Sequence, residues 1–390
     1  MPATSFAPAE VQQLIETRRD LHAHPELAFE ETRTASVVAE RLKSIGLSPR
    51  TGVGRTGVIA TIEGGKPGKT VLLRADMDAL PIQEENEIPY RSQHAGRMHA
   101  CGHDCHTSIL LGVATRLAAS SASLPGRAKL VFQPAEEAGD GAQSMIRDGA
   151  LLDPRPDAAF GLHVWQDLDL GMVGVTAGPM MAAVDAFRVT VTGLGAHAAA
   201  PQLGVDPVVC LAQMITALQT IASREADPLQ ALVVSVTQLE AGSAFNIIPP
   251  SATMHGTVRV FDPSLWAEMP GRFERIVQGV AQAFRCTAQI EYDRCNGPTV
   301  NDPRMAEIAR AAAIEVVGEK HVTGDVRTMG GEDFSAFLLE VPGCFIAIGS
   351  RNAGRGLVHG HHHPRFDVDE DCLAIGAEVL LRTAQRYLAT

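Results

Sequence analysis

The first 183 residues alternate short apolar runs with stretches of helical periodicity. Two amphipathic helices are expected over residues 10–47, and further helices at 106–120 and 142–152. Four apolar runs bounded by turn residues read as buried strands: residues 57–64, 70–78, 129–137 and 158–165. Strands that alternate with helices predict a largely parallel sheet with helices on both faces.

The rhythm changes from about Val184. The pattern there predicts strands at 185–193, 230–240, 252–261 and 287–293, and helices at 206–225 and 263–285. Their order, β-α-β-β-α-β, is the ferredoxin-like arrangement. We therefore predict an α/β fold in which residues 1–183 and 298–390 form a first domain and residues 184–297 an inserted second one. A helix near 303–318, an apolar run at 343–349 and a last helix from Asp371 complete the first domain.

Composition narrows the class of protein. A length of 390 residues with 45% apolar and 20% charged residues fits two globular domains. The net charge of -12, without a cluster of Lys or Arg, argues against a nucleic-acid partner. The chain starts without a basic and apolar leader, and no apolar run approaches the ~18 residues of a membrane helix. Its seven cysteines lack the spacing of a disulfide framework, so we expect a cytoplasmic protein without membrane contact.

Groups that bind metals or move protons follow the predicted strands. Asp76 and Asp78 end the second strand, Glu136 and Glu137 follow the third, and His163 ends the apolar run of the fourth. The carboxyl ends of parallel strands meet at one edge of a sheet, so these side chains are expected to converge. Taken alone, the two glutamates could be a solvated acidic turn and the histidine a hydrogen-bonded core residue. Their convergence favours a site.

The segment HACGHDCHT, residues 99–107, is open to three interpretations. A structural zinc knuckle would need a second Cys/His pair at similar spacing, and the chain lacks one. A redox pair is disfavoured because Cys-x-x-x-Cys is not the thioredoxin spacing. A catalytic metal site is favoured, with a further ligand from HGHHHPRF, residues 359–366.

Ten segments, in order along essentially the whole chain, carry a resemblance to a known family: RRDLHAHPELAFEE, RADMDALPI, MHACGHDCHT, FQPAEE, GLHV, GAHAAAP, FNIIP, GTVR, GGEDFSAF and HHPRFDVDE. Together they resemble the M20 metallopeptidases, in particular the amidohydrolase branch. That branch includes hippurate hydrolases, N-acyl-amino-acid deacylases and hydrolases of indole-acetyl amino-acid conjugates. The resemblance implies a dinuclear metal centre in the α/β domain, and a smaller lid domain through which two chains form a homodimer.

Matched residue by residue, the resemblance implies five metal ligands: Cys101, His103, Glu137, His163 and His362. Cys101 would bridge the two ions, where many relatives use an aspartate. Asp78 matches an aspartate that orients a ligand, whereas Asp76 stands where relatives have a metal-binding histidine. Cys105 and His106 are expected to begin the next helix rather than to bind metal.

The chemistry of these residue types agrees with that ligand set. Two divalent ions ~3.5–4 Å apart acidify a bridging water and polarise an amide carbonyl. A base must then lie beside the ions without binding them. Glu136 fits this role, because neighbours in an extended segment point opposite ways and only one of Glu136 and Glu137 can then be a ligand. A mixed set of Cys, His and carboxylate ligands suits Zn, Mn, Co or Ni.

Three lid residues match residues that contact substrate in the family. Arg259 offers a bidentate fork for a carboxylate, while His197 and Asn246 can donate hydrogen bonds to an oxyanion. The predicted activity is hydrolysis of N-acyl or N-aroyl amino acids, such as hippurate. A dipeptidase or aminopeptidase is the alternative within enzymes. Such an enzyme would need surplus acidic residues in the lid to hold a free α-amine, and the predicted lid shows none. A non-catalytic metal- or ligand-binding protein on the same scaffold would be expected to have lost the base or a ligand. Glu136 and all five ligands are present, which disfavours this alternative.

Overall fold

The computed structural model describes residues 4–390, which divide into two compact units. The first contains the chain up to Gly178 together with Val300–Arg327 and Asp333–Thr390; the second contains Pro179–Thr299 and Thr328–Glu332. The short segment Thr328–Glu332 was expected in the first domain. It joins the second unit because Ala182 donates its N–H to the carbonyls of Thr328 and Gly330.

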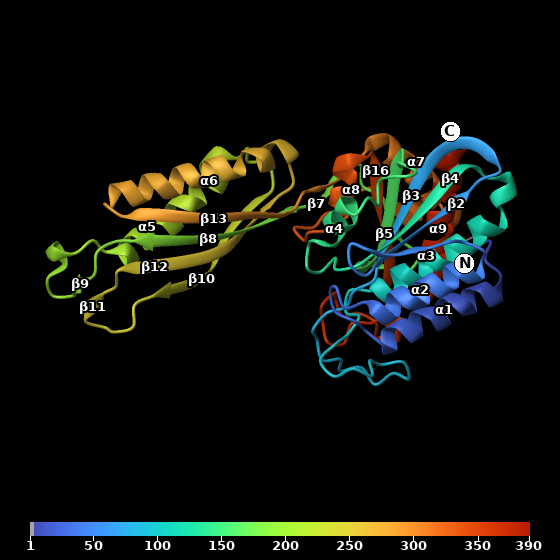
Figure 1. Cartoon of the computed structure of the whole chain (residues 1–390), viewed down its shortest axis with the longest axis horizontal. Coiled ribbons are helices and arrows are strands. Elements are labelled where there is room, and N and C mark those ends of the chain that lie inside the picture. Colours follow the sequence, from blue (N-terminus) through green and yellow to red (C-terminus); the bar gives the residue numbers. More distant parts are fainter. Residues whose placement is uncertain (1–3) are drawn as a thin grey trace. The chain divides into compact units, whose positions relative to one another are not determined.

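An eight-stranded sheet forms the centre of the first unit (Figure 1), in the order β1-β2-β4-β3-β5-β16-β6-β15. Its strands are β1 (Arg50–Val53), β2 (Gly57–Glu63), β3 (Lys66–Asp76), β4 (Pro125–Gln133), β5 (Ala158–Asp169), β6 (Val173–Gly174), β15 (Val322–Thr323) and β16 (Gly343–Arg351). The four central strands β4, β3, β5 and β16 run parallel, and β2 pairs with β4 in the antiparallel sense. The mostly parallel α/β sheet predicted from the sequence is confirmed.

Helices cover this sheet and create its core. They are α1 (Pro8–Ala23), α2 (Thr32–Ser44), α3 (His103–Ala119), α4 (Gly141–Arg147), α7 (Pro303–Val317), α8 (Ser335–Glu340) and α9 (Asp371–Leu388). The last seven residues of β3 are all buried, as expected for a strand covered on both faces. Alternate residues such as Val71 and Leu73 pack with α3 and α9 in one core. Every helix within residues 4–390 is too short or too polar to cross a bilayer.

The second unit has its own sheet and core (Figure 1). Its main elements are β8 (Ala183–Thr192), α5 (Pro207–Thr220), β10 (Leu232–Ala241), β12 (Ser251–Val260), α6 (Pro263–Ala283) and β13 (Thr287–Asn296). This is the β-α-β-β-α-β order expected from the sequence, folded into an antiparallel sheet of order β10-β12-β8-β13. A small ribbon pairs β9 (Ala196–His197) with β11 (Ile247–Ile248). The chain crosses between the units within β7 (Gly178–Met181) and β14 (Thr299–Asn301).

Candidate metal centre

The parallel strands bring the expected site residues to one place in the first unit. Asp76 ends β3 and lies opposite Gln133, the last residue of β4. Glu136 and Glu137 follow β4 directly, and His163 lies in β5, which pairs with the other side of β3. Cys101 and His103 lie at the start of α3. Side chains from separate segments therefore meet at the carboxyl ends of β3 and β4.

Two groups of donor atoms share the thiol of Cys101. The Cys101 Sγ lies with ring nitrogens of His103 and His163, and again with Glu137 and His362; the donor atoms of each group lie within 4.8 Å of one another. The distance from Cys101 Sγ to His163 Nε2 is 3.4 Å, and that from His362 Nε2 to Glu137 Oε1 is 3.2 Å. Two three-residue groups that share one thiol have room for two cations, one on either side of it.

Hydrogen bonds fix the orientation of two histidines beside this centre. His103 Nδ1 faces Asp78 Oδ1 at 3.3 Å, which leaves its Nε2 buried and without a hydrogen-bond partner within residues 4–390. His163 Nδ1 donates to the carbonyl of Val164 at 2.5 Å, so its Nε2 carries the lone pair. A histidine that donates from one nitrogen to a carboxylate or carbonyl is the usual form of a metal ligand.

Glu136 and Glu137 both approach His103, but not by the route expected. The prediction of an extended segment at 136–137 is wrong: β4 ends at Gln133, and the Gly139 N–H closes a turn on the Glu136 carbonyl at 2.8 Å. The preceding Ala135 has a φ of 53°. Glu136 Oε2 and Glu137 Oε1 each lie 3.9 Å from His103 Nε2. Glu137 Oε1 also lies 3.2 Å from His362 Nε2.

A strained loop presents His362. Its φ is 64°, a conformation that a non-glycine residue rarely adopts, and its N–H donates to the Ala100 carbonyl at 2.8 Å. Its side chain is 53% exposed, the most open of the five expected ligands. The hydrogen bond to Ala100, one residue before Cys101, ties this loop to the start of α3.

The electrostatics of the cluster suit a cation. Burial and the adjacent Glu137 raise the pKa of the Cys101 thiol well above its usual value. Burial opposes a charge on Glu137 as well, yet the hydrogen bond with His362 lowers the pKa of that carboxyl. Burial holds the pKa of His163 well below its usual value, so this ring is neutral. A bound cation deprotonates a thiol outright, and neutral imidazole and carboxylate complete a donor set that fits divalent transition metals.

Asp76 forms a donor group with His103 and His106, but both of its oxygens already accept hydrogen bonds. Its Oδ1 accepts from His106 Nδ1 at 2.6 Å, and its Oδ2 accepts from Arg74 at 2.7 Å. Burial alone would raise the pKa of Asp76, but two neighbouring histidines and Arg74 lower it well below its usual value. The Asp76 carboxylate is therefore ionised, and its hydrogen bonds hold Arg74 and His106 in place.

His106 was expected to lie in the helix and not to bind metal, but its supporting role could not be predicted from the sequence. Its Nε2 accepts the Val164 N–H at 2.9 Å while its Nδ1 donates to Asp76, so the ring links β3 to β5 directly beside His163. The motif contains His106, but nothing in its spacing distinguishes a supporting histidine from a ligand. The hydrogen bond to the Val164 N–H makes that distinction, because it occupies the only lone pair of the ring.

The second unit places the three expected substrate residues at two ends of its sheet. His197 and Asn246 are neighbours in the β9–β11 ribbon, where the Ala198 N–H donates to the Asn246 carbonyl at 3.0 Å. Arg259 lies near the other end of β12, opposite Val184. The eight residue steps from Ser251 to Arg259 span about 26 Å at ~3.3 Å per step along a strand. Within one chain, Arg259 and the ribbon are too far apart to hold one small substrate.

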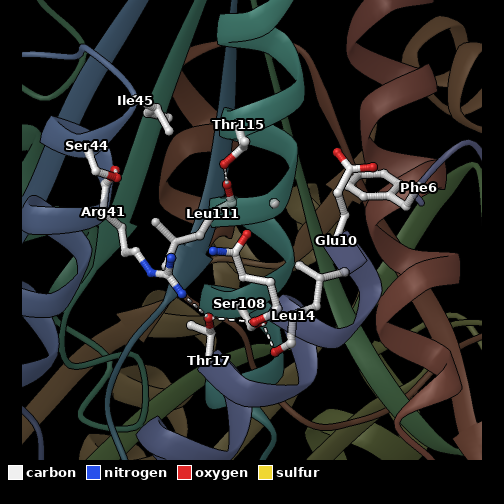
Figure 2. A pocket seen from close by; sticks show the side chains of 12 residues that line it. Phe6, Glu10, Leu14, Thr17, Arg41, Ser44, Ile45, Ser108, Leu111 and Thr115 are labelled. Atoms are coloured by element: carbon white, nitrogen blue, oxygen red, sulfur yellow. Dashed lines mark hydrogen bonds between the residues drawn. The ribbon is translucent and has the colours of Figure 1, made fainter. Parts of the chain in front are cut away.

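A separate hollow lies between α1, α2 and α3 (Figure 2) and has a volume of about 90 Å³. Leu14, Leu111 and Ile45 form apolar walls, and Arg41 donates to the Thr17 hydroxyl at 3.1 Å. Its lining contains neither histidine nor cysteine. The candidate metal-binding groups among the described residues lie elsewhere, around Asp76, Cys101, His103 and Glu136.

Comparison with known proteins identifies the family. The model of peptidase family M20/M25/M40 matches residues 72–386 of this chain. The chain belongs to this family. As an M20 hydrolase it is 41% identical to N-acetyl-L-cysteine deacetylase of Bacillus subtilis over 377 residues, which are 97% of this chain and 88% of that protein. It is 38% identical to IAA-amino acid hydrolase ILR1-like 4 of Arabidopsis thaliana over 379 residues, 96% of this chain and 86% of that one.

A solved structure with the same fold comes from Bacillus subtilis. The YXEP protein, described as a dinuclear metal binding peptidase from the M20 family, has a TM-score of 0.86 and 34% identity to this chain. The match covers 98% of this chain and 100% of that one. The family resemblance carried by the ten sequence segments is thus confirmed, and the chain is an M20 hydrolase related to amidohydrolases.

Proposed function

We propose that this M20 hydrolase is a dinuclear metal-dependent amidohydrolase that cleaves N-acyl or N-aroyl amino acids to a carboxylic acid and a free amino acid. The observation that carries the proposal is the pair of donor groups joined at Cys101, with the Glu136 carboxylate 3.9 Å from His103. The five ligands would be Cys101, His103, Glu137, His163 and His362. When bound, two divalent ions supply an acidified water and polarise the amide carbonyl.

The chain's own groups would perform the proton transfers. Glu136 lies beside the ligands and takes the proton of the attacking water, then passes it to the departing amine. Asp78 acts by holding His103 in the required orientation, since it accepts from Nδ1 and also from the backbone N–H groups of Glu136 and Glu137 at 3.0 Å each. One carboxylate therefore orders both a ligand and the base.

The second unit would act as a lid that holds the substrate. Arg259 is proposed to bind the amino-acid carboxylate, and His197 and Asn246 to donate to the oxyanion of the tetrahedral intermediate. Because Arg259 and the ribbon lie at opposite ends of one sheet, we propose a homodimer in which the ribbon of one chain serves the site of its partner. Names of relatives, a deacetylase and an amino-acid conjugate hydrolase, support an N-acylated amino acid as substrate.

A hydrolysis screen tests the proposal. Purified enzyme loaded with Mn, Zn, Co or Ni is given N-acetyl, N-benzoyl and N-indoleacetyl amino acids, the same compounds with an amidated carboxylate, and unblocked dipeptides. We expect hydrolysis of the acylated acids, with a strong rise in KM or no turnover for the amides. Equal rates on acid and amide would remove Arg259 as the anchor, and a preference for dipeptides would replace the proposal with a dipeptidase.

A further inference from the structure

Glu31 is a buried carboxylate without a cationic partner. Its side chain is 0% exposed, and within residues 4–390 no Lys, Arg or His nitrogen lies within ion-pair distance of it. Its Oε1 accepts the backbone N–H groups of Phe29 at 3.0 Å and Ala135 at 2.8 Å, and its Oε2 accepts the Thr56 hydroxyl at 2.5 Å. Burial raises the pKa of this carboxyl. Burying a carboxylate that is hydrogen-bonded only by neutral donors reduces the stability of the fold. Residues that reduce stability in this way are often found at functional sites.

Ala135 is the residue at which the chain turns from β4 towards the two glutamates. It is fully buried and has a φ of 53°, in the left-handed region, which is energetically unfavourable for an alanine. Its N–H goes to Glu31, and the next two N–H groups, those of Glu136 and Glu137, go to Asp78. Three consecutive amides are thus held by two carboxylates, one of them 104 positions away in the sequence.

We propose that Glu31 is a positioning residue for Glu136, which it controls by fixing the left-handed Ala135. The inference rests on the proposed function, in which Glu136 is the base. Without Glu31 the Ala135 N–H loses its acceptor, and the segment can relax out of the left-handed conformation. Asp78 holds the N–H groups of both glutamates, but Glu136 follows Ala135 directly, whereas Glu137 is one residue further on and its carboxylate meets His362. The loss should therefore fall on the base and spare the metals.

Glu26 provides a matched control. Its carboxylate also accepts two backbone N–H groups, those of Arg33 at 2.9 Å and Thr34 at 2.8 Å, and the Thr32 hydroxyl at 3.2 Å. These partners lie at the start of α2, and none belongs to the segment 133–137. Replacing Glu26 removes a comparable set of hydrogen bonds close to Glu31 in the sequence but leaves Ala135 untouched.

The test compares Glu31→Ala, Glu31→Gln, Thr56→Val and Glu26→Ala in the metal-loaded enzyme, with metal content measured beside kcat and KM. We expect Glu31→Ala to lower kcat ~10–100-fold with both metals retained and KM little changed, the scale that a small misplacement of a reacting group produces. Glu31→Gln keeps an acceptor for the Ala135 N–H and should stay within a few-fold of wild type. Thr56→Val should give a smaller fall, and it replaces Glu31→Ala if that variant does not fold. Glu26→Ala should leave kcat unchanged.

The same substitution in the Glu136→Gln enzyme separates a positioning role of Glu31 from general damage to the fold. In the Glu136→Gln enzyme, adding Glu31→Ala should lower the residual rate no further, because the group that Glu31 positions is already inactive. A further fall of the same size, loss of metal in proportion to activity, or an unchanged kcat in Glu31→Ala would each overturn the role. Failure of the proposed function is seen separately, as an inactive wild type or a fully active Glu136→Gln.

Discussion

Asp76 and Glu137 are both acids near His103, yet they differ in the groups that they contact. Both oxygens of Asp76 accept hydrogen bonds, from His106 and Arg74, whereas Glu137 Oε1 lies 3.2 Å from Nε2 of His362, another expected ligand. The same criterion separates His103, whose Nε2 has no partner, from His106, whose Nε2 accepts a backbone N–H. At the residue scale, the neighbours of each side chain separate the proposed ligands from their supports.

Glu136 and Glu137 should therefore fail differently when neutralised. Glu136→Gln is expected to keep both metals and lose ~10²–10⁴-fold in kcat, the usual contribution of a general base. Glu137→Gln is expected to lose metal, because it removes the charge of a buried ligand. Metal analysis and single-substrate kinetics on the same preparations measure both effects. Glu63→Gln, an exposed acid on β2 that pairs with Arg127, serves as control. A metal-free Glu136→Gln beside an active Glu137→Gln would reverse the assignment.

At the scale of elements, the sequence predicts what depends on local pattern and misses what depends on distant contacts. The order of strands and helices follows from the spacing of apolar residues along the chain in both units. The run at 129–137 reads as one strand, but the strand ends at Gln133, before Pro134, and the left-handed Ala135 gives its N–H to Glu31, far away in the sequence. The motifs bring together the candidate ligands, but the role of Asp76 requires its contacts with Arg74 and His106.

Gly102 shows how an element's start controls the site. It precedes α3 with a φ of 96°, and a Cβ placed on it would lie 2.3 Å from Val164 Cγ2, next to His163. Gly102→Ala should cost both backbone strain and this contact, and it should displace Cys101 and His103. Gly171 has a φ of 90° and open space around its Cβ position, so Gly171→Ala carries only the strain, ~1–3 kcal/mol. Urea denaturation should show a larger loss for Gly102→Ala, accompanied by lower metal content. Equal losses of stability in the two variants would mean that the Val164 side chain moves aside without reducing stability.

At the scale of the whole molecule, the proposed site residues are divided between the two units. The first unit contains the proposed metal ligands and base, while the second carries Arg259 near one end of β12 and the His197–Asn246 ribbon beyond the other. A substrate held by Arg259 would leave the ribbon of the same chain about 26 Å away along β12, as estimated from the strand rise. A second copy related by two-fold symmetry can supply the missing ribbon, because each chain then gives to its partner what it lacks.

Mixing two inactive variants tests this arrangement. His197→Ala removes the ribbon donor and Glu136→Ala removes the base, so each homodimer should be nearly inactive. Co-refolding equal amounts gives random dimers, half of them mixed. In a mixed dimer the chain with the intact base faces the partner with the intact ribbon, so one of its two sites is complete. Roughly a quarter of wild-type activity should return. His255→Ala, on the same sheet but outside the ribbon, replaces His197→Ala as control and should be active without mixing. If mixed dimers form, as mass spectrometry can establish, and activity stays at the sum of the two variants, each ribbon serves its own chain or none.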